Sequence, residues 1–264
     1  MIDTVEQALV SPRYLAGGGD AAWITVPLHR ACGWSYGHDP LMPRVILTSP
    51  DQQAHLRLEP NPDNQWWRLR HAATRNSPSW YASFSARTPV ELIAAVTDAL
   101  TDPAASRTGS ASPLDPLQDA GWQWQPSTRV SPDGITEVEH FTNHGCNSWF
   151  ITAALSKDHE NQLWQARFDG NTPDYLITAF TQALADPAPL ARDPLLLPPH
   201  LRRHPHLHLH LHLHLHLHTE QVPVETVASA LERRVAQLTA RHPNALTKQL
   251  PTRPSPQPGP GHRR

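Results

Sequence analysis

The clearest ligand chemistry in this 264-residue chain is an alternating Leu-His tract near its C-terminal end. Residues 204–218 contain eight histidines in fifteen residues. Neutral imidazole is a good ligand for Zn, Ni and Cu, and several flexible imidazoles chelate such ions without a preformed site. We therefore predict that the tract binds divalent metal in vitro through His206, His208, His210, His212, His214, His216 and His218.

The composition of this tract favours adventitious metal binding over a selected site. A perfect dipeptide repeat is typical of slippage in a short DNA repeat, and the tract contains no Cys, Asp or Glu to fix the coordination geometry. As a strand it would place histidine on one face and leucine on the other, which also favours aggregation. We predict chelation in vitro and no resident cofactor.

The other reactive side chains do not form a recognisable catalytic pattern. His140, His144 and Cys146 lie within seven residues, but their segment is typical of a turn between strands and shows no fourth metal ligand. The glycines of residues 17–20 lack the Lys-Ser/Thr of a phosphate-binding loop and predict a turn. Because Cys32 and Cys146 hold non-equivalent positions in the two halves of the chain, no repeated disulfide is expected.

One group of aromatic and basic residues suits a binding face. Trp66 lies beside Arg68 and Arg70 in the sequence, and Arg57 and Tyr81 lie on neighbouring segments. Arginine and aromatic side chains are enriched at protein interfaces. A core position for Trp66, and an ordinary solvated sheet face for the arginines, are the alternatives.

The elements that must position these groups are encoded twice. Residues 80–103 recur as residues 164–187, and the match extends upstream with small shifts in spacing. Six tryptophans occupy repeated positions and are expected to fill two cores, whereas Trp23, Trp66 and Trp124 have no counterpart. The other shared motifs are Ser49-Pro50-Asp51 with Ser131-Pro132-Asp133, Trp67 with Trp149, and Gly33-Trp34 with Gly121-Trp122.

Each copy has the pattern of an antiparallel meander followed by one helix. Alternating apolar and polar residues, separated by turn-rich stretches, predict strands over 45–49, 55–59, 66–71 and 80–85 in the first copy. In the second copy they predict strands over 136–141, 148–155 and 163–169. A helix should follow each meander and cover its apolar face.

The start of each helix is marked by a repeated Thr-Pro. Thr88 is expected to cap the first helix, with Pro89 at its first position and Glu91 completing a capping box. Thr172 is expected to cap the second, which should run from Pro173 to about residue 185. The fold class is therefore α+β, with two tandem repeats that are each a short β-meander backed by one C-terminal helix.

The two predicted outer sheet faces differ in charge. The first copy offers Arg57, Arg68 and Arg70, where the second offers Glu137 and Glu139. The two copies are therefore expected either to pair in part through these charges or to expose them to solvent.

The charge pattern also divides the chain into an acidic body and a basic tail. Up to residue 191 there are 12 Lys and Arg against 20 Asp and Glu, and from residue 192 there are 10 against 4. The net charges of −8 and +6 limit nucleic-acid binding to a weak, salt-sensitive interaction. With neither a secretory leader nor an apolar run long enough for a membrane span, we expect a cytoplasmic protein.

The predicted organisation has five parts. These are a first unit over 8–105, a second unit over 112–190, a Pro- and His-rich linker over 192–222, an amphipathic helix over 223–242 and a disordered Pro-rich tail over 243–264. The apolar stripe of that helix is too short for a stable isolated coiled coil. It must therefore dock on the body, pair with a second chain or remain marginal.

Several strings resemble a known family. Leu15-Ala16-Gly17-Gly18-Gly19-Asp20, Gly33-Trp34-Ser35-Tyr36-Gly37-His38 and Gln65-Trp66-Trp67 are similar to motifs of the actinobacterial domain-of-unknown-function family 317, as is the stretch from Trp80 through Thr88-Pro89. The resemblance covers about residues 8–192 and implies two tandem units, but no catalytic residues. We expect a non-enzymatic protein–protein interaction module with an unidentified partner. A weak nucleic-acid-associated factor is the alternative, followed by an enzyme without a recognisable site.

Overall fold

The computed structural model describes residues 3–38, 44–60, 64–102, 104–105, 112–125, 128–143, 146–155, 161–197 and 216–242. Its main feature is a ten-stranded antiparallel sheet in the order β2-β3-β4-β5-β6-β11-β10-β9-β8-β7. The strands of the first copy are β2 (Ser35–His38), β3 (Val45–Thr48), β4 (Ala54–Leu58), β5 (Trp67–His71) and β6 (Trp80–Phe84). Those of the second are β7 (Gln123–Gln125), β8 (Thr128–Val130), β9 (Thr136–Asn143), β10 (Cys146–Ala154) and β11 (Gln162–Asp169).

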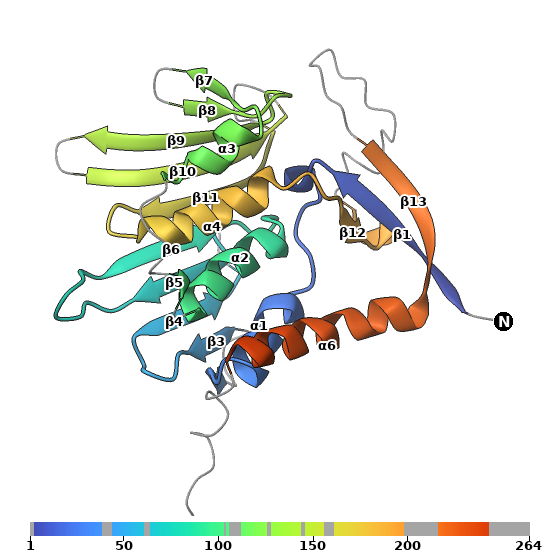
Figure 1. Cartoon of the computed structure of the whole chain (residues 1–264), viewed down its shortest axis with the longest axis horizontal. Helices are drawn as coiled ribbons and strands as arrows, with labels where there is room; N and C mark the ends of the chain where they lie inside the picture. The colour runs from blue at the N-terminus through green and yellow to red at the C-terminus, as the bar shows by residue number, and fades with distance from the viewer. Residues whose placement is uncertain are drawn as a thin grey trace, which may run out of the picture.

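The helices lie on one side of this sheet (Figure 1). They are α1 (Ala22–Arg30) and α2 (Val90–Thr101) in the first copy, and α3 (Asp115–Asp119) and α4 (Asp174–Ala185) in the second. The aromatic ring of Phe180 on α4 lies 5.9 Å from that of Phe84 and 5.4 Å from that of Phe168. The α+β class and the meander-plus-helix plan of each copy are therefore confirmed, with α2 and α4 packed side by side over one shared core.

The two copies join through their last strands, around a pseudo-twofold axis. In the β6–β11 pairing Phe84 lies opposite Ala166 and Ala82 lies opposite Phe168, and these are equivalent pairs under the sequence repeat. The axis passes through the central pair, Ser83 and Arg167. Of the two alternatives for the charged outer faces, pairing of the copies through these charges is not the one observed, because backbone hydrogen bonds between strand edges join the copies.

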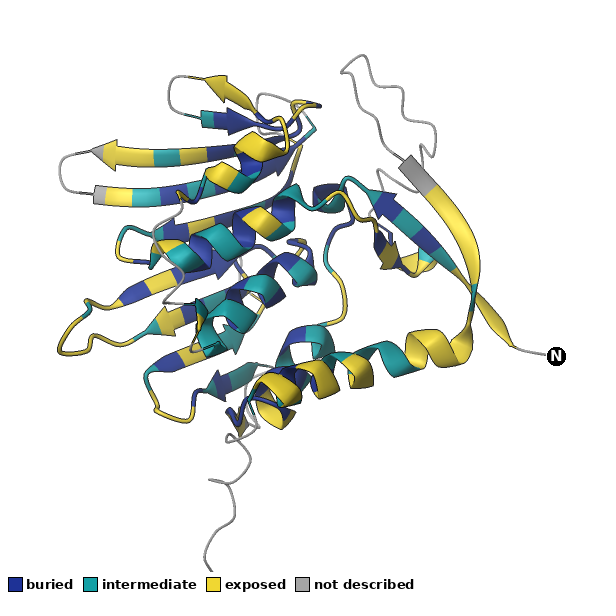
Figure 2. Cartoon of the chain, viewed as in Figure 1, coloured by how far each residue is buried: buried dark blue, intermediate teal, exposed yellow. Residues whose placement is uncertain are grey.

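The repeated tryptophans fill the core, as predicted. All six are buried: Trp34, Trp67, Trp80, Trp122, Trp149 and Trp164. Of the tryptophans without a counterpart, Trp66 and Trp124 are exposed and Trp23 is partly exposed. Figure 2 shows the resulting alternation of buried and exposed residues along the strands.

The repeated Ser-Pro-Asp motif forms the same turn in both copies. Ser49 Oγ donates to a carboxylate oxygen of Asp51 and accepts a hydrogen bond from the backbone N–H of Ala54 at 2.8 Å. In the second copy, Ser131 Oγ bonds Asp133 and accepts from the N–H of Thr136 at 2.9 Å. The motif therefore fixes the tight connection that leads into β4 and into β9.

The start of α2 differs from the predicted capping box. The Thr88 side chain makes no capping bond, and its buried Oγ1 has no hydrogen-bond partner among the described residues. Instead, the N–H of Val90 donates to the carbonyl of Gly18 at 3.0 Å, so the glycine loop caps α2 from outside its own segment. The helix starts at Val90, and Glu91 pairs with Arg192 rather than completing a capping box.

Thr172 is likewise not a cap, because α4 begins at Asp174 without a side-chain capping bond. Its hydroxyl donates to the carbonyl of Tyr81, on the last strand of the other copy, at 3.3 Å. The repeated threonine therefore ties the two copies together at this position.

A second, three-stranded sheet in the order β12-β1-β13 adds to the duplicated body. It contains β1 (Thr4–Ser11), β12 (Leu190–Arg192) and β13 (His216–Pro223), with the 3-10 turns η1 (Arg13–Leu15) and η3 (Pro194–Leu196) beside it. β13 pairs with β1 along its whole length and leads directly into α6 (Val224–Arg241). The segment predicted as a linker thus contributes a strand to a sheet.

The C-terminal half of α6 docks on the body. Val235 and Leu238 are buried, and Arg234 forms two bonds to the Asp98 carboxylate at 2.8 and 3.0 Å. The predicted tail over 243–264 lies outside the described residues. No helix in the described part of the chain is both long and apolar enough to cross a membrane.

Candidate functional site

The candidate binding face lies on the side of the sheet that none of the described helices covers. Inward-facing residues such as Leu56 and Leu69 belong to the core, whereas their neighbours along β4 and β5 point to the opposite side. The strand register aligns Arg57 with Arg68, and Arg70 with Tyr81. Four of the predicted residues are therefore brought together on three adjacent strands.

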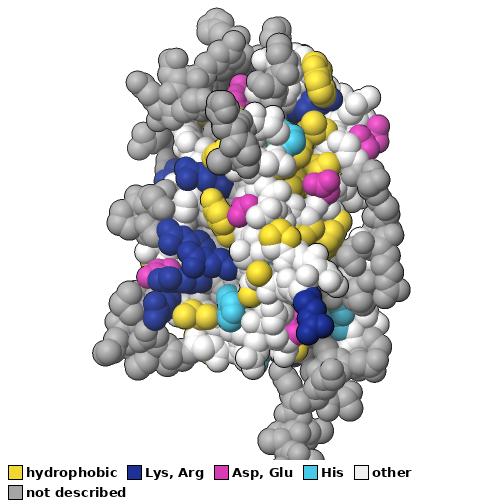
Figure 3. All heavy atoms as spheres, turned by 90° about the vertical axis from the view of Figure 1, so that its left-hand side faces the viewer, with side chains coloured by type: hydrophobic (Ala, Val, Ile, Leu, Met, Phe, Trp, Pro, Cys, Tyr) yellow, Lys and Arg dark blue, Asp and Glu magenta, His cyan; other side chains and the backbone are white. Residues whose placement is uncertain are grey.

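The second copy adds one arginine to this surface. Arg167 lies opposite Ser83, which in turn lies opposite Arg68, so the row of basic residues continues across the pseudo-twofold axis. Arg167 Nε donates to Gln165 Oε1 at 2.6 Å, which holds its side chain along the face. We call the surface formed by Arg57, Arg68, Arg70, Tyr81 and Arg167 the basic face. Figure 3, which looks toward one end of the strands, shows the largest cluster of Lys and Arg side chains at the left of this view, with smaller groups elsewhere.

The side chains of the basic face differ in how far they are engaged. Arg57 pairs with Glu59, whereas Arg70 is exposed and forms no ion pair with any described residue. Tyr81 is 51% exposed. A free guanidinium beside an exposed aromatic ring can bind a carboxylate or a phosphate and pack on an apolar or planar group.

Trp66 lies at one end of this region, just before β5. It is 36% exposed and lines a cavity of about 450 Å³ with Tyr36, Leu58 and Trp67. This cavity is largely apolar and lies next to the start of α2, where Val90 also lines it. Trp66 therefore lines a small pocket, and it also lies two residues before Arg68 in the sequence.

The outer face of the second copy has the opposite charge. Glu139 occupies the position equivalent to Arg57, and Glu137 the position equivalent to His55. Only β10 lies between these acidic residues on β9 and Arg167 on β11. No ion pair joins Glu137 or Glu139 to Arg57 or Arg70 within the described residues. One continuous sheet surface thus has a basic half and an acidic half.

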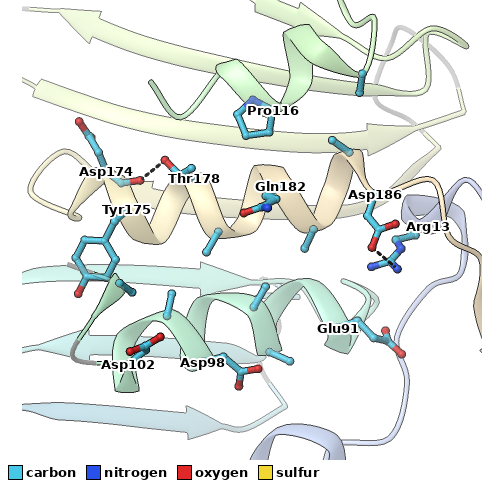
Figure 4. A pocket seen from close by; sticks show the side chains of 18 of the residues that line it. Arg13, Glu91, Asp98, Asp102, Pro116, Asp174, Tyr175, Thr178, Gln182 and Asp186 are labelled. Carbon is cyan, nitrogen blue, oxygen red and sulfur yellow. Dashed lines mark hydrogen bonds and ion pairs between the residues drawn. The ribbon is translucent and has the colours of Figure 1, made fainter. Parts of the chain in front are cut away.

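The helical side of the molecule carries a large groove that the sequence reasoning missed. A cavity of about 1420 Å³ runs between α2 and α4 and reaches α3 and α6. Figure 4 shows the two helices along its sides, with Asp98 and Asp102 on one and Asp174 and Tyr175 on the other. Alanines form much of its lining: Ala94, Ala95, Ala99, Ala179 and Ala183.

The groove combines small apolar residues with acidic rims. Six of its lining residues are acidic and three are basic. Tyr175 adds an aromatic ring to the lining, and burial raises the pKa of its hydroxyl. These alanines become adjacent only when α2 and α4 pack together, so the groove could not be located from either helix alone. The sequence signal for it was that alanines such as Ala95 and Ala179 occur at repeated positions of the two helices.

The remaining candidate groups do not converge into a reactive centre. His140 stacks on Trp149 with ring centroids 3.9 Å apart, and its Nε2 bonds Asn147. β9 and β10 form a hairpin in which Cys146 lies opposite Asn143, as expected for a turn, and His144 lies outside the described residues. Burial raises the pKa of the Cys32 thiol, which opposes thiolate formation. Within the described residues, no three His, Cys, Asp or Glu side chains are close enough to hold a metal.

Most of the predicted metal-binding tract lies outside the described residues, and only His216 and His218 fall in a described strand. We expect the chain to be retained on a nickel column at neutral pH and to lose retention between about pH 7 and pH 5, because chelation requires neutral imidazole with a pKa near 6.5. Replacing the six histidines from His204 to His214 by Gln should abolish retention without altering β13. A variant with His55→Gln and His71→Gln should still be retained, and loss of retention there would assign the binding to the body.

Comparison with known proteins gives a match to one family model over two segments of the chain. Residues 48–105 and 130–190 match the sequence model of SPDY, a domain of unknown function (DUF317). Neither a curated protein nor a solved structure matches the chain. The two matched segments begin at equivalent positions, one residue before each Ser-Pro-Asp turn, and each contains the last three strands of its copy and the helix that follows them. Each structural copy therefore contains one segment that is similar to the DUF317 model.

Proposed function

We propose that this protein is a non-enzymatic interaction module that binds an acidic surface of a partner protein through its basic face. Its actinobacterial origin and cytoplasmic location, expected from the sequence, are part of the same proposal. The observation that carries it is the cross-strand alignment of Arg57 with Arg68 and of Arg70 with Tyr81 on the helix-free side of the sheet.

The chemistry of the basic face supports a protein partner. Arginine and tyrosine contribute strongly to protein interfaces because they combine extended contact area with directional hydrogen bonds. The strands that carry them are held by the buried core beneath, so little backbone ordering accompanies binding. The adjoining acidic half, with Glu137 and Glu139, opposes a uniformly acidic ligand that extends across the axis.

Nucleic acid is the second candidate, and the same geometry favours it. Arginines on an open antiparallel sheet bind phosphates, and an exposed ring such as Tyr81 stacks on a base. The excess of acidic residues up to residue 191 opposes this reading. We expect only weak binding of a single-stranded oligonucleotide, lost between 50 and 200 mM salt, in which range phosphate-dominated binding weakens steeply.

The test compares three full-length proteins as baits in the native host: the wild type, the triple variant Arg57→Ala/Arg68→Ala/Arg70→Ala, and the control Arg75→Ala. Arg75 is an exposed arginine in the loop between β5 and β6 and lies outside the basic face. We expect the triple variant to lower recovery of a specific partner at least about tenfold, since truncation of even one hot-spot arginine costs about 2 kcal/mol or more. The control should recover the partner fully.

Two further arms separate the candidates. Nuclease treatment should leave a protein partner bound, whereas it would release a partner held through nucleic acid. Equal recovery by all three baits would reject the basic face as the binding surface. Truncation at residue 192 is unsuitable as a test because it would remove Arg192, β13 and α6 from the folded body.

A further inference from the structure

We propose that the groove between α2 and α4 is the docking site of the chain's own basic C-terminal segment, residues 243–264. This inference concerns the helical side of the molecule and does not depend on the partner of the basic face. It predicts an intramolecular contact that residues beyond α6 make with the body.

The unpaired charges of the groove are mainly negative. Glu91, Asp98 and Asp186 are each paired with an arginine, at 2.6, 2.8 and 2.6 Å. The carboxylates of Asp119 and Asp174 form no ion pair within the described residues. Among the described residues, the Asp102 carboxylate accepts one hydrogen bond, from the backbone N–H of Ala104. Three carboxylates around the groove therefore have no cationic partner in the part of the chain that the structure describes.

The C-terminal segment has the complementary charge. Its charged residues are Lys248, Arg253, Arg263 and Arg264, and it contains no Asp or Glu. It is also rich in proline, and a proline-rich chain packs well on a flat aromatic surface such as Tyr175 with little loss of conformational entropy. The alanines of the groove leave room for a backbone to approach the helices closely.

The connection places this segment at the groove. Arg241, the last residue of α6, itself lines the cavity, and 22 residues follow His242. A helix of 12 residues such as α2 is about 18 Å long. About six extended residues span that distance, so the segment is long enough to run the full length of the groove.

The test measures trypsin cleavage after Lys248 in the full-length chain. The groove variant Asp102→Asn/Asp119→Asn/Asp174→Asn removes these three carboxylates and leaves the cleavage sequence intact. The control Asp3→Asn/Glu6→Gln/Glu225→Gln removes three exposed carboxylates outside the groove. Equal melting temperatures of the three proteins would show that the body is unaffected.

At low salt we expect the wild type and the control to be cleaved about five- to tenfold more slowly than the groove variant, because cleavage follows the population of undocked segment. The difference should disappear at 1 M salt, where screening acts over about 3 Å. An excess of synthetic peptide 243–264 should speed cleavage of the wild type by competing for the groove.

Equal cleavage rates in all three proteins at low salt would overturn the proposal. Protection that grows with protein concentration would also overturn it, since the segment would then occupy the groove of a second copy.

Discussion

Replacing Trp164 by alanine is expected to lower the free energy of unfolding by about 3–5 kcal/mol. Trp164 is 1% exposed, and its ring packs edge-on against Phe180 on α4 with centroids 6.4 Å apart. Its indole N–H donates to the carbonyl of Tyr14 at 2.7 Å, which ties the segment after β1 to the core of the second copy. The substitution would leave a cavity and one unpaired buried carbonyl.

Urea denaturation followed by circular dichroism measures this loss. Trp124→Ala is the matched control, because Trp124 is 67% exposed and its removal should change the free energy of unfolding little. An unchanged midpoint for Trp164→Ala would contradict the shared core under α2 and α4.

The second large effect is expected at Arg192. Its guanidinium forms two bonds to the Glu91 carboxylate, at 2.7 and 2.6 Å, and donates to the carbonyls of Gly17 and Gly18. Arg192→Ala should lower the free energy of unfolding by about 2–4 kcal/mol, since it leaves Glu91 partly buried without its partner. The expected loss does not exceed this range, because the Glu91 side chain is 21% exposed and solvent can partly replace its partner.

A double-mutant cycle with Glu91→Ala isolates the pair. The double variant should be less destabilised than the sum of the single variants, with a coupling of about 1–3 kcal/mol. Arg30→Ala is the control, because its pair with Glu232 is exposed and should contribute little. Strict additivity would show that Arg192 acts through its backbone contacts alone.

The local elements of the fold were predictable because their signals lie within short windows. Period-two alternation located β4, β5, β6, β9, β10 and β11, and repetition of Trp and Ser-Pro-Asp identified the two copies. By contrast, β1 pairs with residues that lie 180 or more positions away, so no turn or hairpin motif marks it. The strand β13 begins inside the Leu-His tract. The regular alternation of that tract indicated a low-complexity segment and not a strand that pairs with β1.

Prediction of the candidate sites was limited in the same way. Alternation placed Arg57, Arg68 and Arg70 on one face, and the strand register then brought Tyr81 beside them. Arg167 joins this surface only because β6 pairs with β11, a contact that no single copy encodes. Glu91 fitted a capping box by spacing alone, but tertiary contact with Arg192 overrode that local preference.

The axis between β6 and β11 has a consequence for how a ligand is oriented. In a dimer of identical subunits related by such an axis, every surface residue would occur twice, and a ligand lying across the axis would bind equally well in two opposite directions. Because one chain encodes both halves here, Arg68 corresponds to Phe150 and Arg57 to Glu139. The covalent link between the halves therefore gives the shared sheet a polarity, and a ligand that spans it is bound in a single direction.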